Sequence, residues 1–289
     1  MMQGDLQERV AHHEAIGAQA SRDPVLACAE AELLRRALGV APGPARTCVA
    51  WHEDAGDLIL EHDADAWQLR GRAPFVAGAP GAEEILVCAR SAHGVVVLVL
   101  DPAHPGVHVT RLDVLGGEPV GALQLDHPTL AEDAWLTSDD ASAVIGEARA
   151  RAAVLVCAEL AGAAHAALDF AVAHAKQREQ FGRPIGSFQA VQHHLARMRV
   201  DADATRLAAR DAAARIDAGE PAPIHAALAK LAAAPAARRV VATAHQVVGG
   251  PGLYADAPLH RWYRHVKALE WRGGMPQAHA AALADDLGL

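Results

Sequence analysis

The sequence of 289 residues predicts an α+β protein with a short helical region, a middle β-domain and a C-terminal helical bundle. Hydrophobic residues make up 52% of the chain but aromatic residues only 4%, so alanine supplies much of the apolar surface, which favours closely packed helices. Short β-branched runs are confined to residues 47–136, and a helical pattern follows them. We therefore expect three regions, at residues 1–46, 47–136 and 142–289.

The first region is helical. Residues 4–40, which end in "AEAELLRRALGV", are typical of one or two short helices, and the prolines and glycine of "APGPAR" then interrupt the pattern. The polar start "MMQGDLQERVAHHEA" has no apolar core of the kind that a signal peptide needs.

The middle region has the pattern of strands. Runs such as "TCVAWHE", "EEILVCARS", "GVVVLVLDP" and "VHVTRLDVL" recur at intervals of roughly ten residues and are bounded by turn formers, which favours an antiparallel sandwich or barrel. Trp67 and Leu69 alternate with Gln68 and Arg70, as in a half-buried strand.

The last region is helical to the end of the chain. One helix is predicted over 146–176 and ends at "FGRPIGS"; the next begins near Ser187 and carries an apolar stripe at spacings of three and four. A third covers about 223–248, with Pro235 as an expected kink, and one or two short helices fill 259–287.

Charge and cysteine content exclude several kinds of partner. A net charge of −9 with scattered Lys and Arg argues against nucleic acid. No apolar run free of charged residues approaches the ~18 residues of a membrane span. The four cysteines show no metal-binding spacing, and we interpret them as buried hydrophobic residues in a reducing cytoplasm. The pairs His12–His13 and His193–His194 are interpreted as surface or interface residues.

A first polar cluster follows the longest predicted helix. Arg178, Phe181 and Gln189, within "REQFGRPIGSFQ", provide a cation, an aromatic face and an amide around a chain reversal. This combination suits a nucleotide diphosphate. Taken alone, Arg178 is equally consistent with a charge that complements a helix C-terminus.

A second cluster lies in "HQVVGGPGLY". Gln246 precedes Gly249 and Gly250 at a helix end. A glycine C-cap explains the pair of glycines. Alternatively, the glycines let the backbone approach a phosphate while Gln246 adds a polar side chain.

These segments resemble the acyl-CoA dehydrogenase family. "REQFGRPIGSFQ" is similar to the family's R-x-x-F-G-x-x-[IL]-x-x-x-Q signature, "HQVVGGPGLY" to its Q-x-x-G-G-x-G segment, and "AWQLRGRAP" to a strand of its β-domain. The resemblance extends from about residue 47 to residue 274.

The resemblance implies a fold of N-terminal helices, a middle antiparallel β-domain and a C-terminal four-helix bundle. It also implies dimers or tetramers in which FAD lies across a subunit interface. By motif position, Arg178, Phe181 and Gln189 match residues that reach the neighbour's FAD diphosphate and flavin. Gln246, Gly249 and Gly250 match residues that hold the ADP part.

The chemistry implied is α,β-dehydrogenation of an acyl-CoA thioester, in which a glutamate removes the α-proton as hydride leaves to the flavin. The sequence departs from the family at both places where this glutamate occurs. One position is Gly273 and the other is Ala152, and neither side chain accepts a proton. Glu147, Glu159 and Glu270 lie near these positions but out of register.

The β-domain departs from the family as well. "AWHEDAGD" and "FVAG" replace flavin-facing segments, so Ala50 and Ala77 stand where hydroxyl residues are expected. The N-terminal helical region is also shorter than is usual in the family, so part of the acyl pocket wall is expected to be missing.

These departures predict a non-catalytic half of an α₂β₂ heterotetramer that completes the FAD site of a homologous partner. Two alternatives remain open. In the first, the chain is a homomeric dehydrogenase whose base is displaced to Glu270 or Glu147. In the second, it is a non-enzymatic binding protein that has kept the fold. No metal, nucleic acid or membrane partner is expected.

Overall fold

A computed structural model describes residues 5–51, 57–63, 66–92, 94–130, 134–137 and 140–289. Its helices are α1 (Asp5–Gln19), α2 (Val25–Leu38), α3 (Ser142–Gln177), α4 (Gln189–Asp217), α5 (Ala222–Val248), α6 (Leu259–Leu269) and α7 (Pro276–Asp286). Its strands are β1 (Thr47–Ala50), β2 (Asp57–Asp63), β3 (Ala66–Ala77), β4 (Glu84–Ser91), β5 (Gly94–Leu100), β6 (Val107–Leu112), β7 (Val120–Thr129), β8 (Glu179–Gln180) and β9 (Arg183–Pro184).

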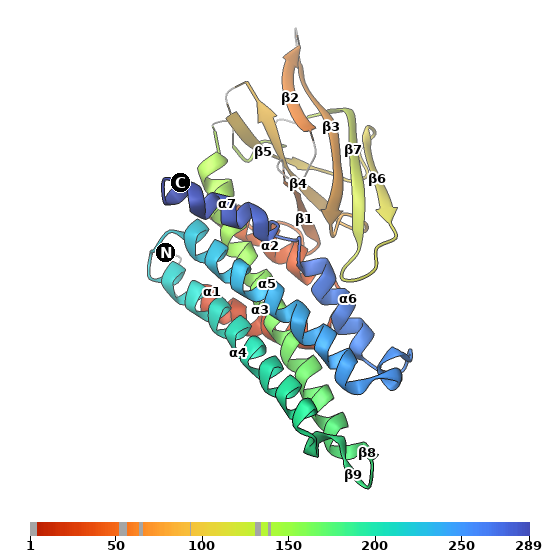
Figure 1. Cartoon of the computed structure of the whole chain (residues 1–289). Coiled ribbons are helices and arrows are strands. Elements are labelled where there is room, and N and C mark those ends of the chain that lie inside the picture. The colour runs from red at the N-terminus through yellow and green to blue at the C-terminus, as the bar shows by residue number, and fades with distance from the viewer. Residues whose placement is uncertain (1–4, 52–56, 64–65, 93, 131–133, 138–139) are drawn as a thin grey trace. The chain divides into compact units, whose positions relative to one another are not determined.

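The chain forms two compact units (Figure 1). The helical unit comprises Met1–Ser21, Leu115–Gly117 and Ala153–Leu289, and the sheet unit comprises Arg22–Val114 and Glu118–Ala152. Helix α1 thus belongs to the helical unit and α2 to the sheet unit. The division into three regions made from the sequence stays a prediction.

The sheet unit contains a seven-stranded sheet in the order β1-β4-β2-β3-β7-β6, with β5 also paired to β4. Most pairings are antiparallel, as predicted, but β1 and β2 both run parallel to β4. The α+β fold class is confirmed, and the sheet is mixed.

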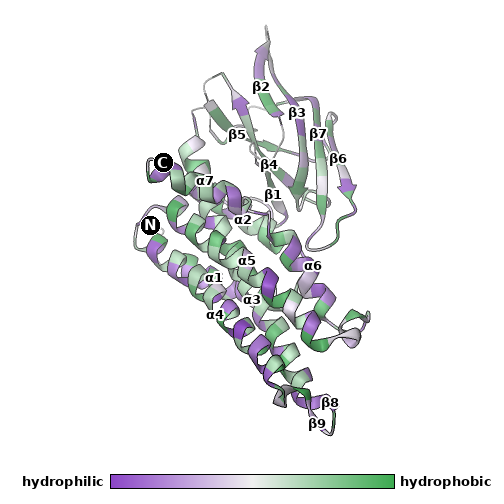
Figure 2. Cartoon of the chain, in the orientation of Figure 1, coloured by the Kyte–Doolittle hydropathy of each residue, from purple (hydrophilic) through white to green (hydrophobic). Residues whose placement is uncertain are grey.

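Strand β4 is buried on both faces. Ile85 and Val87 pack in one apolar cluster of the sheet, whereas Leu86 and Cys88 pack in a second cluster with Leu34 of α2. A strand covered on both sides has no polar face, which explains why "ILVCA" shows no alternation of apolar and polar residues. Its partner β5 is likewise hydrophobic along its length (Figure 2).

The helical unit packs through small residues. A Cβ atom at Gly17 of α1 would lie 2.0 Å from the carbonyl oxygen of Glu159 in α3, and one at Gly162 would lie 1.9 Å from that of Glu14. Only glycine permits two helices to approach this closely. Alanine therefore dominates the helices because their backbones lie near one another.

Helix α1 is also held by polar contacts at its start. The backbone N–H groups of Leu6 and Gln7 donate to the carboxylate of Asp217, at the end of α4, over 3.3 and 3.1 Å. A carboxylate at this place satisfies amides that the helix leaves without partners and complements its dipole.

Helix α3 is long and apolar enough to cross a membrane by length and composition, but 83% of its most apolar stretch is buried inside the protein. Burial of this kind is what a core helix shows.

The helices expected from the sequence are present with shifts of a few residues at their ends. The predicted helix over 146–176 is α3, which begins four residues earlier, and the next predicted helix is α4, which begins at Gln189. Helix α5 continues through Pro235.

Candidate functional site

The first predicted cluster lies on a β-hairpin between α3 and α4. Strands β8 and β9 pair antiparallel, Gln180 opposite Arg183. The two residues between them, Phe181 and Gly182, both have positive φ, of 54° and 77°. Two consecutive left-handed residues make the tight turn that suits a two-residue hairpin.

Phe181 is the unusual member of this turn. A left-handed backbone costs a non-glycine residue roughly 1–2 kcal/mol, and the Phe181 side chain recovers little by burial because it is 92% exposed. Its ring makes a T-shaped contact with Phe188, with centroids 6.1 Å apart. Backbone strain of this kind is concentrated at binding and catalytic sites, so Phe181 is a candidate for contact with something outside this chain.

Arg178 follows the last residue of α3, and its backbone N–H still donates to the carbonyl of His174 over 2.8 Å. Its side chain is exposed. The pKa of His174 is lowered, first by partial burial and then by the nearby charge of Arg178. The guanidinium of Arg178 is therefore available to an anion in solution.

Gln189 is the first residue of α4, and its side chain is exposed. The preceding residue, Phe188, supplies no side-chain cap to the helix. The turn is held instead by Gln192, whose amide donates to the carbonyl of Gly186 over 3.0 Å. The predicted trio of Arg178, Phe181 and Gln189 thus lies at the short connection between α3 and α4.

The second predicted cluster lies at the end of α5. Gln246 is exposed in the last turn, and Gly249 follows the helix with φ 70° and ψ −146°, a conformation that glycine alone adopts readily. A Cβ atom at Gly249 or Gly250 would meet no atom within 4 Å, so the backbone of both residues faces open space. A ligand could approach this backbone closely.

The two clusters lie at the same end of the helical unit. Helices α4 and α5 pack against each other and are connected by a short turn. They contain 29 and 27 residues and so have similar lengths. The start of α4 and the end of α5 therefore lie at similar positions along the helix axes. Among the described residues, no hydrogen bond, ion pair or ring contact joins the two clusters.

Gly273 stands at the position expected for the catalytic glutamate and has no side chain. Gly273 has φ 68°, and a Cβ atom there would lie 3.2 Å from the Cα atom of Ala153 in α3. The other expected position, Ala152, is buried and apolar. Neither can act as a base.

The carboxylates near these positions are engaged in ion pairs. Glu270 accepts a short contact from Lys267 and lies 3.3 Å from the guanidinium of Arg238. Glu147 pairs with Arg151, one turn further along α3, over 2.9 Å. Both are neutralised by neighbouring cations.

The third carboxylate, Glu159, lies in a buried cluster that the sequence did not reveal. The Nδ1 atom of His13 is 2.8 Å from its Oε1 atom, and the Nε2 atom of His265 is 3.1 Å from its Oε2 atom. Burial raises the pKa of Glu159, but the hydrogen bonds and charges of the two histidines outweigh this, so the pKa lies below its ordinary value. His13 was interpreted as a surface or interface residue, but it is only 2% exposed within this chain because α1 packs on α3 and α6.

Lys230 is a second buried polar residue that the sequence patterns did not reveal. Its side chain is fully buried, and Nζ donates to the carbonyl of Leu269 over 2.8 Å and, through a short contact, to that of Arg272. It therefore caps the end of α6 and fixes the turn before Gly273. Burial raises the pKa of Cys157 to about 11, partly opposed by the charge of Lys230. A single lysine within "AALAKLAAAP" was the only signal in the sequence.

The segments of the β-domain that the resemblance places beside a flavin are described in part. Ala50 ends β1 and is buried, and Ala77 ends β3 and is partly buried. Residues 52–56 of "AWHEDAGD" lie outside the described residues. Both alanines offer only methyl groups.

Comparison with known proteins defines the class to which this fold and these clusters belong. The family described as "Acyl-CoA dehydrogenase, C-terminal domain" matches residues 143–288. The chain is 32% identical over 245 residues to a 3-(aryl)acrylate reductase of Clostridium sporogenes, and 32% identical over 228 residues to a glutaryl-CoA dehydrogenase of Desulfococcus multivorans. These matches cover 81% and 73% of this chain, but only 65% and 58% of the two relatives.

A solved structure is similar over more of the chain. The ChsE4–ChsE5 complex of Mycobacterium tuberculosis contains a chain that is 30% identical, with a TM-score of 0.87, covering 97% of this chain and 80% of that one. The chain belongs to the acyl-CoA dehydrogenase family, whose members are FAD-dependent oxidoreductases.

Proposed function

We propose that this chain is the non-catalytic subunit of a heteromeric acyl-CoA dehydrogenase and completes the FAD site of a homologous partner. The observation that carries the proposal is the contrast between the two sites. The base position, Gly273, is left-handed backbone packed on Ala153, whereas Arg178 and Gly249 remain exposed for a ligand of another subunit.

The exposed residues fit FAD by their chemistry. Arg178 offers a guanidinium, which pairs with phosphate oxygens through two parallel hydrogen bonds. Gln189 and Gln246 offer amides, and the backbone at Gly249 and Gly250 is open. When bound, FAD supplies the two-electron oxidation of the acyl-CoA. In this proposal the present chain orients the nucleotide, and the partner provides the base and the acyl pocket.

The similarity to a chain of the ChsE4–ChsE5 complex supports a heteromeric assembly. We infer a heterotetramer of two copies of each subunit, acting on an acyl-CoA. We also place it in the cytoplasm, because Cys48, Cys88 and Cys157 are buried in the manner of small hydrophobic residues.

Co-expression with a full-length homologue tests the proposal. Flavin absorbance should appear only when both chains are purified together, and an acyl-CoA should bleach it. Flavin bound and bleached by the lone chain would instead establish a homomeric dehydrogenase. A colourless preparation in both cases would indicate a binding protein without enzymatic activity.

Arg178→Ala should strip flavin from the complex while both subunits still co-elute in size-exclusion chromatography. The matched control is Arg215→Ala, because Arg215 is an exposed arginine of α4 that pairs with Asp211 over 2.9 Å. Equal flavin retention in the two variants would contradict the assignment of Arg178.

A further inference from the structure

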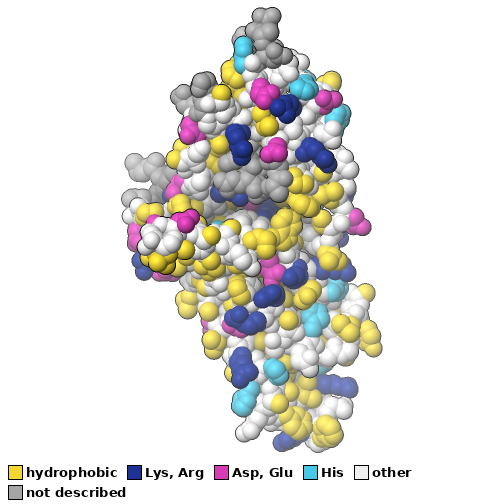
Figure 3. All heavy atoms as spheres, turned by 45° about the horizontal axis from the view of Figure 1, so that its top comes forward, with side chains coloured by type: hydrophobic (Ala, Val, Ile, Leu, Met, Phe, Trp, Pro, Cys, Tyr) yellow, Lys and Arg dark blue, Asp and Glu magenta, His cyan; other side chains and the backbone are white. Residues whose placement is uncertain are grey.

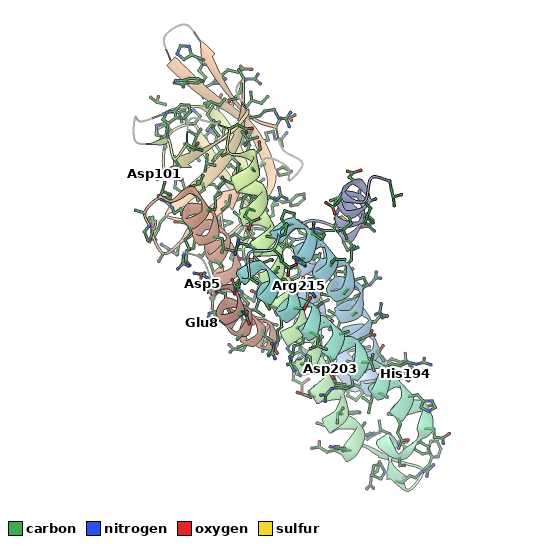
Figure 4. The ribbon with its side chains drawn as sticks, turned by 90° about the vertical axis from the view of Figure 1, so that its left-hand side faces the viewer. Asp5, Glu8, Asp101, His194, Asp203 and Arg215 are labelled. Carbon is green, nitrogen blue, oxygen red and sulfur yellow. The ribbon has the colours of Figure 1, made fainter. Side chains whose placement is uncertain are left out.

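The arginines of the helical unit differ in whether a carboxylate neutralises them. Along α4 and α5, Arg199 pairs with Asp203 over 2.7 Å, Arg215 with Asp211 over 2.9 Å, and Arg239 with Asp201. Figure 4 shows Arg215, Asp203 and His194 in succession along α4 toward the hairpin.

The hairpin itself has a different character. Within the part of the chain that the structure describes, neither Arg178 nor Arg183 has a carboxylate within ion-pair distance, and both are exposed. In Figure 3, cationic and hydrophobic side chains meet at the end of the helical unit that carries this hairpin. Among the described residues, two arginines of one hairpin thus lack an ion-pair partner in a protein of net charge −9, and Glu179 of the same hairpin lies opposite Pro184.

The hairpin directs both arginines to one face. Gln180 is opposite Arg183, and the backbone N–H of Ile185 donates to the carbonyl of Arg178 over 2.8 Å, which continues the same register by one pair. Residues two apart in a strand share a face, and directly opposite residues share it too. Arg178, Gln180 and Arg183 therefore project from the same side of the ribbon.

Arg183 is held in place by an aromatic ring. Its guanidinium carbon lies 4.1 Å from the centroid of the Phe188 ring, which Phe181 contacts edge-on. Stacking engages the face of the guanidinium and leaves the N–H groups at its edge free to donate. The stack therefore favours one position of the guanidinium, with its N–H groups open to an anion.

We propose that Arg183 is a second phosphate-binding residue of the nucleotide site, and that it holds the FAD diphosphate together with Arg178. This rests on the proposed function. The diphosphate of FAD carries two negative charges and several oxygen atoms that accept hydrogen bonds. Two guanidinium groups on one face of the hairpin supply two positive charges and paired N–H donors for these oxygens. Phe188 acts as a positioning residue for Arg183.

The test uses the co-purified complex with the partner subunit, stripped of flavin, and measures Kd for FAD and for ADP by titration. Arg183→Ala should weaken both by about tenfold or more, because it removes a charge-assisted interaction with the diphosphate that the two ligands share. Arg183→Lys, which keeps the charge but loses the fork, should lie between Arg183→Ala and the unmodified complex. Phe188→Leu should weaken both ligands less than Arg183→Ala does.

The controls separate this proposal from the proposed function. Arg215→Ala should leave both Kd values unchanged. If Arg178→Ala weakens FAD binding but Arg183→Ala stays within twofold of the unmodified complex, Arg183 is not a ligand and the FAD-completing role stands. If Arg183→Ala weakens FAD but not ADP, the residue contacts the flavin half and the diphosphate assignment is wrong. If neither Arg178→Ala nor Arg183→Ala changes the Kd for FAD, both the assignment of Arg183 and the proposed function are wrong.

Discussion

Gly273 packs against Ala153 so closely that a Cβ atom on the glycine would lie 3.2 Å from the Cα atom and 3.3 Å from the Cβ atom of the alanine. The glycine also has φ 68°. The turn after α6 therefore presses its backbone onto α3 at the point where the resemblance places a catalytic glutamate.

Gly273→Glu should not create a working base in this subunit. The new side chain would need a strained left-handed backbone and a shift of α3, together costing about 2–4 kcal/mol of unfolding free energy. Urea unfolding measures this cost, with Gly39→Ala as control because Gly39 has φ 71° and open space around it. Turnover by the variant with a base-deficient partner would contradict the expectation.

Glu270→Ala should leave turnover of the complex intact. The carboxylate is occupied by Lys267 and Arg238, and its side chain is only 18% exposed. We expect a loss of stability of about 1 kcal/mol with unchanged flavin content and steady-state rate. A lost rate with retained flavin would identify Glu270 as a base.

Gly162→Ala should loosen α1 from the helical unit, because the new methyl group would lie 1.9 Å from the carbonyl oxygen of Glu14. We expect the free energy of unfolding to fall by about 3 kcal/mol and proteolysis within α1 to become faster. Gly146→Ala, on the same helix with no atom within 4 Å, should instead stabilise by about 0.5–1 kcal/mol. Similar effects of the two substitutions would refute the close approach of α1.

Glu159→Gln should remove a pH-dependent part of the stability. Because the pKa of Glu159 is lowered in the folded state, its ionised form adds stability above the unfolded pKa, and this contribution is lost as pH falls through the folded pKa. The difference in unfolding free energy between the two proteins should shrink as the pH falls below about 4.3. A difference that stays constant down to pH 3 would show that the folded-state pKa is not lowered.

Lys230→Met should free the turn that precedes Gly273. Removal of the ammonium leaves the carbonyls of Leu269 and Arg272 without this donor. This should lower the free energy of unfolding by about 2–4 kcal/mol. Hydrogen exchange of amides 270–274 should accelerate, whereas Lys176→Met, an exposed lysine at the end of α3, should change nothing. Unaltered exchange in the Lys230 variant would exclude its role as a cap.

Local patterns in the sequence predicted most of the elements. The apolar stripe at spacings of three and four after Ser187 identified α4, and β-branched runs identified the strands, because periodicity follows directly from which face of an element is buried. The positions of Arg178, Phe181, Gln189, Gln246, Gly249 and Gly250 came from motif spacing, and the structure places them on two exposed turns at one end of the helical unit. Their roles stay predictions.

Long-range packing decided the rest. The sequence by itself determined the fold class, the order of the elements and the absence of an acid at positions 152 and 273. Only the tertiary structure decided that His13 and His265 enclose Glu159, that Lys230 caps α6 and that Gly273 lies on α3. The physical reason is that a buried polar residue is compensated by partners 39 to 146 positions away, and periodicity within one helix carries no information about them.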